Sequence, residues 1–418
     1  MKKIKHIFSI LLALAVILPA TAQSVPAGSK ITVGTPAFQN GGEADTWVPI
    51  YVQGQLTTDF QNYSGLTVID RQAARQLMEE QKIKEQNAYI AGSEDEIQYA
   101  ALVDADYLVS VMLIKTGSSF SLQCSIQSVK SSSLVGKVYS APNLSETDLS
   151  SGSAVHKASY ELLSGIGVPE DSLFMLKDNS NKQQSETAAN VFTAKGMAVE
   201  QQGGSIVQAM AYYQKAVGSS SAITEAASRL DGLTSQISGV NLGETAMKDM
   251  KLRKQWQKIW EDMIAYTKDN WADVAYDPSL LDFKNPNYEK GTIDLVLPIT
   301  ARLNPEVKDL WIRLIDAYVK TPKQGDWKLD NFYDWGDVQK RIKPEIAMAI
   351  YNSDDVCIGH AKATYNLSWC DGSIGFFWGV KELRAKAVNP ELITDSLSVK
   401  IETNCPGGRV RAMQAKKL

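Results

Sequence analysis

The sequence YLVSVMLI at residues 107–114 decides the fold of the N-terminal region. It is almost continuously apolar, which is typical of a strand in a sheet whose two faces are both covered. The sequence SFSLQCSIQSV at 119–129 alternates apolar and polar side chains instead, as a half-exposed strand does. Helical patterns lie around these two strands, together with shorter strand patterns at 31–38, 66–69 and 134–140. We therefore predict a helix-flanked mixed sheet over residues 30–168.

The remaining chain divides into three stretches. Residues 169–188 are largely polar and predict a linker. Residues 189–275 predict a helical domain, in which a tetratricopeptide-like helix pair over 189–235 precedes a tryptophan-rich helix. Residues 290–410 alternate in short runs, which favours an antiparallel β-sandwich. The expected class is therefore a multidomain α+β protein.

Aromatic side chains give the first candidate binding surface. Trp256, Trp260 and Trp271 fall on one side of the predicted helix, and Trp327 and Trp335 lie in an aromatic-rich insertion. A helical stripe of this kind is typical of a core or a domain interface, and we favour that interpretation. A platform on which carbohydrate rings stack is the alternative.

The charge balance excludes some functions. The chain has 418 residues, with 43 basic and 47 acidic side chains and a net charge of -4. Loss of the first 22 residues would remove three lysines and leave 40 basic against 47 acidic residues, a net charge of -7. That charge argues against a nucleic-acid partner, which requires a basic stripe. Only three histidines occur and His6 precedes residue 22, which excludes a site of three histidines in the mature chain.

Residues 1–22 predict a secretory signal peptide. Lys2, Lys3 and Lys5 precede an apolar run of 12 residues at 7–18, and ATA at 20–22 suits cleavage. The run is too short for an ordinary membrane helix, although a retained anchor is the alternative. No cysteine lies near the cleavage point for lipid attachment, and no later stretch predicts a membrane span. We expect a periplasmic or secreted protein.

The cysteines fit an oxidising compartment without defining a pairing. Cys357, Cys370 and Cys405 lie in the last 62 residues, and a disulfide among them is one interpretation. Free buried thiols are the other. Cys124 lies on an apolar strand face and predicts a core position.

Motifs of catalysis are missing from the sequence. It has no G-x-S-x-G, no phosphate-binding loop and no G-x-G-x-x-G. Cys357 and His360 are an odd number of residues apart on a predicted strand, so they point to opposite faces and make a poor metal site with Asp354 and Asp355. His156 shows no catalytic partner and predicts a surface or half-buried position. We expect no catalytic residue, cofactor or metal ion, and predict that the protein is not an enzyme.

Three motifs resemble a known superfamily. They are ITVGTPAF at 31–38, LTVIDR at 66–71 with a following helix that ends in LMEEQ, and DADYLV at 104–109. In this order they are similar to the superfamily of CsgG curli-secretion proteins, TolB amino-terminal domains and LpoB peptidoglycan-synthase activators. Asp104 stands where that superfamily often has glycine. The resemblance implies structural roles for the motif residues Asp70, Arg71, Glu80, Gln81, Asp106 and Tyr107.

The resemblance also implies a function. It favours a non-enzymatic cell-envelope protein that acts as a protein-binding adaptor or assembly factor, with a peptidoglycan synthase or an outer-membrane assembly as partner. A carbohydrate- or peptidoglycan-binding module is the first alternative, with a glycan as partner. A component of a CsgG-like secretion assembly is the second, although the chain lacks the lipid-bearing cysteine and has no room for a membrane-spanning hairpin between residues 116 and 129.

Overall fold

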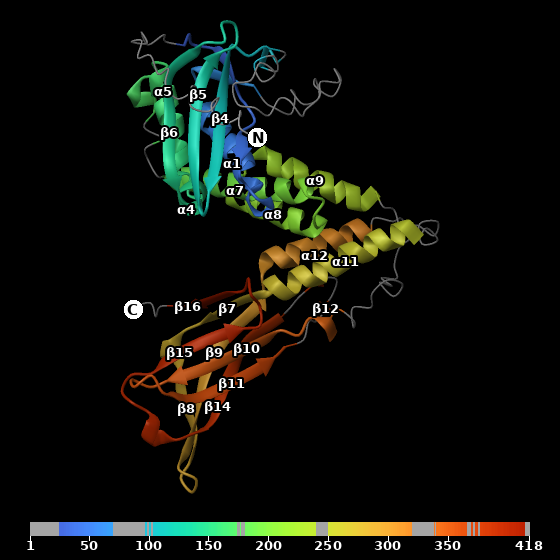
Figure 1. Cartoon of the computed structure of the whole chain (residues 1–418). Coiled ribbons are helices and arrows are strands. Elements are labelled where there is room, and N and C mark those ends of the chain that lie inside the picture. The colour runs from blue at the N-terminus through green and yellow to red at the C-terminus, as the bar shows by residue number, and fades with distance from the viewer. Residues whose placement is uncertain are drawn as a thin grey trace, which may run out of the picture. The chain divides into compact units, whose positions relative to one another are not determined.

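A computed structural model of the chain divides into two compact units, Met1–Ala198 and Val199–Leu418, and each unit is described by itself (Figure 1). The α+β class expected from the sequence is confirmed. The predicted signal peptide lies outside the described residues. No helix of the described part is long and apolar enough to cross a bilayer. The structure describes residues 25–69, 97, 100–101, 103–173, 176, 180–239, 250–319, 338, 340–365, 369–370, 373–374 and 377–413.

A mixed sheet forms the centre of the first unit, as the sequence predicts. Its strand order is β3-β1-β4-β5-β6, and β2 also pairs with β4. β1 runs parallel to β3 and β4, whereas β4, β5 and β6 pair antiparallel. The strands are β1 (Ser29–Val33), β2 (Ala37–Gln39), β3 (Leu66–Val68), β4 (Tyr107–Thr116), β5 (Ser119–Ser128) and β6 (Leu134–Leu144).

Helices cover one face of this sheet and close its core. Alternate side chains of β4 and β5, among them Val111, Leu122 and Cys124, are fully buried in the same cluster as α1 and α5. Burial raises the pKa of Cys124, so its thiol behaves as a small apolar side chain. The helices are α1 (Trp47–Gln61), α4 (Glu146–Ser150), α5 (Ser153–Gly165) and α7 (Asn181–Gln201), with 3-10 turns at Glu43–Asp45 and Glu170–Ser172.

Helix α7 differs from the expectation. Residues 181–188, expected to be part of a linker, form its first turns. Val191 and Ala194 then join the core of the first unit, and the ammonium of Lys195 lies 4.8 Å from the ring centre of Trp47. The predicted helix pair over 189–235 is therefore divided, because α7 packs on the sheet domain while α8 and α9 pack together in the second unit.

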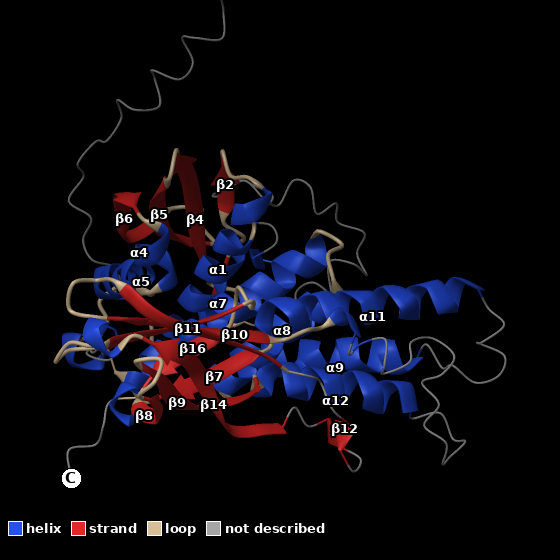
Figure 2. Ribbon diagram, turned by 90° about the horizontal axis from the view of Figure 1, so that it is seen from below, coloured by secondary structure: helices blue, strands red, loops and turns tan. Residues whose placement is uncertain are grey.

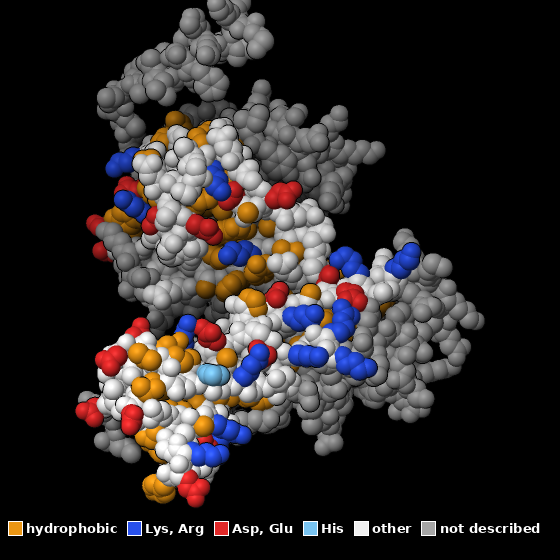
Figure 3. Space-filling model, turned by 60° about the horizontal axis from the view of Figure 1, so that its bottom comes forward, with side chains coloured by type: hydrophobic (Ala, Val, Ile, Leu, Met, Phe, Trp, Pro, Cys, Tyr) orange, Lys and Arg blue, Asp and Glu red, His pale blue; other side chains and the backbone are white. Residues whose placement is uncertain are grey.

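Four helices of the second unit lie beside one another (Figure 2). The tryptophan stripe of α11 faces inward, and the rings of Trp260 and Trp311 meet edge to face with centres 5.2 Å apart. Lys254 and Lys258 are on its exposed side, and Lys and Arg side chains gather over the helices in the view of Figure 3. The helices are α8 (Ile206–Ser219), α9 (Thr224–Gly239), α11 (Met250–Asn270) and α12 (Pro305–Val319).

Two sheets of the second unit pack face to face. One has the order β11-β10-β15, and the other has the order β14-β9-β7-β16 with β8 also paired to β9. They approach closely at Gly359 of β11, where an added Cβ would lie 3.0 Å from Ala385 and Val388 of β14. All their pairings are antiparallel except β7 with β16, and β7 and β8 precede the predicted start at residue 290.

The strands of these sheets are β7 (Ala272–Tyr276), β8 (Asp282–Asn287), β9 (Thr292–Leu303), β10 (Glu345–Tyr351), β11 (Cys357–Thr364), β14 (Phe377–Val388), β15 (Ser398–Thr403) and β16 (Arg409–Ala412). A small separate ladder joins β12 (Trp369–Cys370) to β13 (Ser373–Ile374), and 3-10 turns lie at Pro278–Leu280 and Pro390–Leu392.

The contact between β6 and α5 gives a stability prediction. Gly136 has φ +75°, and an added Cβ would lie 2.8 Å from the backbone C and O atoms of Gly165. We expect Gly136→Ala to destabilise this contact by about 2–4 kcal/mol, through backbone strain and overpacking together. Hydrogen exchange of the β6 and α5 peptides measures the change.

A second glycine provides the control. Gly117 also has a positive φ, +62°, but an added Cβ would meet no atom within 4 Å. Gly117→Ala should therefore cost only the backbone strain of about 1–2 kcal/mol. Equal losses of protection in the two variants would contradict the close contact between β6 and α5.

Candidate functional site

A buried carboxylate organises the polar interior of the first unit. Asp59 on α1 accepts hydrogen bonds from His156 Nδ1, 3.0 Å from both carboxylate oxygens, and from Ser159 Oγ at 2.6 Å. Gln55 Nε2 donates a third at 2.9 Å. Asp59 is only 3% exposed and His156 only 7%, so this hydrogen-bonded pair is largely removed from water.

The same cluster reaches helix α7. Nε2 of His156 lies 3.0 Å from Thr187 Oγ1, and Asn190 Nδ2 donates to Gln55 Oε1 at 3.1 Å. Thr187 and Asn190 are both buried. One hydrogen-bond network therefore joins α1, α5 and α7.

Helical spacing explains how the cluster forms. Each of the three helices contributes two polar side chains one turn apart, so both members of each pair lie on one face. The pairs are Gln55 and Asp59, His156 and Ser159, and Thr187 and Asn190. Gly152, with φ +82°, precedes α5 at this point, and an added Cβ would lie 2.8 Å from His156 Nε2. The absence of a side chain at Gly152 therefore leaves room for the imidazole ring of His156.

The order carboxylate, imidazole, hydroxyl is the one that hydrolases use to activate a nucleophile. Here Thr187 is only 3% exposed, and it does not line the pocket beside Asp59. A buried hydrogen-bonding group that loses its partner costs about 1–3 kcal/mol, and more if it is charged. The geometry therefore indicates that the cluster holds α7 against α1 and α5.

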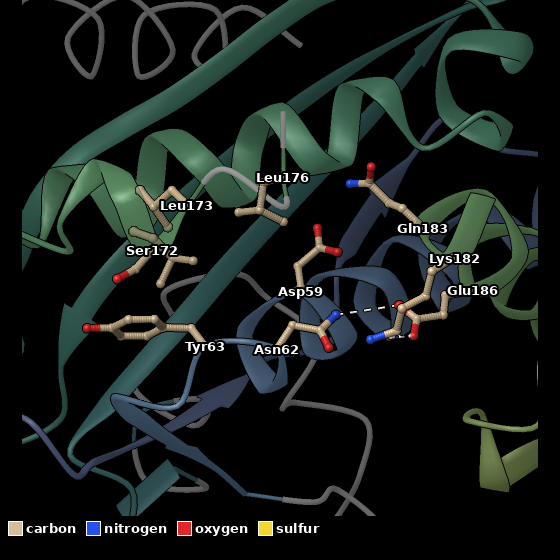
Figure 4. Close-up of a pocket in the computed structure, with 10 residues that line it drawn as sticks. Asp59, Asn62, Tyr63, Ser172, Leu173, Leu176, Lys182, Gln183 and Glu186 are labelled. Carbon is tan, nitrogen blue, oxygen red and sulfur yellow. Dashed lines mark hydrogen bonds and ion pairs between the residues drawn. The ribbon is translucent and has the colours of Figure 1, made fainter. Parts of the chain in front are cut away.

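A small pocket lies next to this cluster, between the end of α1 and the start of α7 (Figure 4). Asp59 points into it, and Lys182 Nζ lies 3.6 Å from Glu186 Oε1 across its rim. Asn62 Nδ2 lies 3.5 Å from Glu186 Oε2. The volume of about 30 Å³ suits a single water molecule and is far below the roughly 300 Å³ of small-molecule sites.

The sheet face opposite to the helices offers a different kind of site. Ser121, Gln123 and Ser125 of β5 alternate with its core residues, and β5 carries no charged side chain. Leu134 and Val138 of β6 precede the inward Val135 and Tyr139, so they point away from the core, and they are 58% and 45% exposed. This open face, which we define as Ser121, Gln123, Ser125, Leu134 and Val138, is amphipathic and uncharged.

Two of the motif residues, Asp106 and Tyr107, lie within the described residues. Asp106 accepts a hydrogen bond from the backbone N of Lys30 at 2.8 Å and so fixes β1 beside β4, which begins at Tyr107. Asp104 has φ +58°, the left-handed region that favours glycine. Asp70, Arg71, Glu80 and Gln81 lie outside the described residues.

The tryptophans that lie within the described residues do not form a binding surface. Trp256, Trp260 and Trp271 are 3%, 4% and 1% exposed, so no ring face is open to a sugar. These rings belong to the core, which agrees with the interpretation favoured from the sequence. Trp327 and Trp335 lie outside the described residues.

The cysteines and histidines are placed as follows. Cys357 is exposed, Cys405 is buried, and both are free thiols, while the side chain of Cys370 lies outside the described part. No group of three or more His, Cys, Asp or Glu side chains in the described part could hold a metal ion. The expectation of a surface or half-buried His156 is wrong, because His156 is buried between Asp59 and Thr187.

Comparisons with known proteins find only weak, partial likenesses. No family model and no curated protein matches the chain. The LpoB C-terminal domain from Salmonella enterica is 17% identical over 33% of this chain and 92% of its own, with a TM-score of 0.24. The PelC dodecamer from Paraburkholderia phytofirmans is 14% identical over 35% and 92% of the two chains, with a TM-score of 0.22. TolB from Acinetobacter baumannii is 14% identical over 37% and 30%, with a TM-score of 0.21.

The buried cluster gives a second prediction. Asp59→Asn keeps the shape of the side chain but places an amide donor among three donors, and we expect it to weaken the attachment of α7 by about 1.5–3 kcal/mol. Hydrogen exchange of the peptides from residues 181–198 measures this loss. Ser159→Ala removes one hydrogen bond and should cost about 1 kcal/mol. If both variants exchange at the same rate, the hydrogen bond between Asp59 and His156 is not what holds α7.

Proposed function

We propose that this protein is a non-enzymatic cell-envelope adaptor whose partner protein docks on the open face of the N-terminal sheet. The observation that carries the proposal is the pair of exposed apolar side chains, Leu134 and Val138, beside the uncharged side chains of β5. The predicted signal peptide supports an envelope address. The three sequence motifs support a role like that of the CsgG and LpoB superfamily.

Burial of this face is energetically favourable. Leu134 and Val138 are 58% and 45% exposed, so removing the rest of each from water contributes roughly half of what full burial gives, or about 1 kcal/mol each. The serine and glutamine side chains can exchange water for hydrogen bonds to a partner, and no charge on β5 has to lose its hydration. Depletion of charge at the centre, with an apolar anchor, is typical of protein–protein interfaces.

The edge of the sheet adds backbone groups to the same surface. β6 is the last strand in the order β3-β1-β4-β5-β6, and within the described residues it pairs only with β5. Its outer N–H and C=O groups can therefore accept an added strand. The partner would then contact side chains on the face and backbone at the edge.

The buried site supports the non-enzymatic part of the proposal. Thr187, the hydroxyl at the end of the Asp59–His156 series, is buried, and the adjoining pocket has room for about one water molecule. An acyl or phosphoryl substrate has no room beside Asp59. The hydrogen bonds of the cluster instead serve to hold the sheet domain in one shape.

A photo-cross-linker placed at Gln123 tests the docking face in the native envelope. Gln123 is exposed at the centre of the open face, and Lys157 is exposed on α5 on the opposite side, where the same cross-linker serves as control. We expect one defined protein partner from position 123 and none from 157. A peptidoglycan synthase would identify the activator-like role, and an outer-membrane protein the assembly role. Equal capture at both positions, or no capture at 123, would refute the proposal.

The apolar anchors give the matched mutational prediction. Leu134→Arg with Val138→Arg should lower the yield of the adduct at position 123 by at least about tenfold, since the apolar contribution of two side chains is lost. Leu280→Arg, at an exposed leucine of the second unit, should leave the yield unchanged. Circular dichroism checks that the variants are folded.

A further inference from the structure

A groove lies between α8 and α11 in the second unit. Its volume is about 330 Å³, within the range of about 300–1,000 Å³ of small-molecule sites. It is therefore much larger than the pocket beside Asp59. The residues that line it are Ser205, Gln208, Ala211, Tyr212, Lys215, Asp262, Ala265, Tyr266, Asp269 and Asn270.

The helical spacing of these residues explains the hollow. On α8 they recur at three or four residues from Ser205 to Lys215, and on α11 they recur in the same way from Asp262 to Asn270. One face of each helix therefore lines the groove. Ala211 lies in the middle of the α8 face and Ala265 in the middle of the α11 face. Their short side chains leave the space between the helices unfilled.

Several polar groups of the groove have no partner in the described part of the chain. The amide of Gln208, the hydroxyl of Tyr212 and the carboxylate of Asp269 make no hydrogen bond or ion pair there. Two other groups are already paired, since Lys215 Nζ lies 3.7 Å from Glu306 and Asp262 accepts from Lys258 at 3.0 Å. Burial, and secondarily Glu306, raises the pKa of Tyr266, so its hydroxyl stays protonated and able to donate.

These groups match the chemistry of a sugar ring. A pyranose has apolar C–H faces, which pack on aromatic rings such as Tyr212 and Tyr266, and a rim of hydroxyl groups. Amide, phenol and carboxylate groups supply both donors and acceptors for that rim. Asp262 is paired with Lys258, so Asp269 is the one unpaired carboxylate among the lining residues. A single carboxylate carries too little charge to hold a metal ion.

We propose that the groove between α8 and α11 binds a sugar unit of a glycan. Trp256, Trp260 and Trp271, three of the candidate residues for a glycan platform, are buried in the core instead. The structure offers tyrosines for the same purpose, at Tyr212 and Tyr266. This site is independent of the docking face on the N-terminal sheet.

Titration calorimetry of the full chain tests the site, with tri-N-acetylchitotriose and maltotriose as probes and choline as the cationic comparison. We expect saturable binding of at least one oligosaccharide with Kd near 1 mM or below, about -4 kcal/mol or stronger. No saturation by either sugar up to about 10 mM would overturn the proposal. Saturation by choline alone would overturn it as well, because the groove would then recognise a cation.

Variants locate the binding in the groove. Ala265→Leu fills the hollow from an exposed helix position and should weaken sugar binding more than about tenfold. Tyr212→Phe keeps the ring and removes one hydroxyl, which should weaken it about three- to tenfold. Tyr288→Phe, at an exposed tyrosine of the β8–β9 hairpin, should have no effect. Native affinity in Ala265→Leu, or an equal loss in Tyr288→Phe, would refute the assignment.

Discussion

The hydrogen bond between Asp59 and His156 is the interaction on which the helical layer of the N-terminal unit depends. A carboxylate as buried as that of Asp59 is stable only if its charge and its oxygens have partners. Those partners come from α1 and α5, and Thr187 extends the network to α7. Any shift of one helix along another would separate a donor from its acceptor. The network therefore fixes the position of each helix relative to its neighbours, which apolar contacts alone would not do.

This arrangement also leaves the other side of the sheet available. The core formed by α1, α5 and α7 lies on one face, since Val111 and Leu122 point into it and their neighbours Ser110 and Ser121 point away. The apolar residues near the start of β4 pack in a smaller cluster of their own, with Ala100, Ala105 and Leu108. Toward β5 and β6 the same face carries serine, glutamine and two exposed apolar side chains. Within the described residues, this face is therefore covered at the start of β4, where Leu108 and Ser110 are buried, and exposed over β5 and β6.

The fold could be predicted from the sequence where its signal is local. The period of two in β5 and the unbroken apolar run of β4 are properties of adjacent residues, and both elements occur where expected. The partners of His156 lie 97 and 31 residues away, beyond any local pattern. Helix α7 was missed as part of the sheet domain because its buried face includes Glu186, Thr187 and Asn190. Polar residues in a core break the apolar periodicity that identifies a packed helix. The groove between α8 and α11 depends on which helices become neighbours, which spacing within each helix does not reveal.

The composition of the open face is itself an argument about its role. β5 lies inside the sheet, between β4 and β6, and carries no charged side chain. β6 carries one lysine, Lys137, between its two exposed apolar residues, and Pro142 lies near its end. Hydroxyl and amide groups keep such a face hydrated, yet they release water at a smaller cost than charges do. A surface that is soluble without charge and partly apolar can be covered by a partner and uncovered again. An adaptor requires that property, whereas a face that served only to remain in water would be better protected by lysine and glutamate.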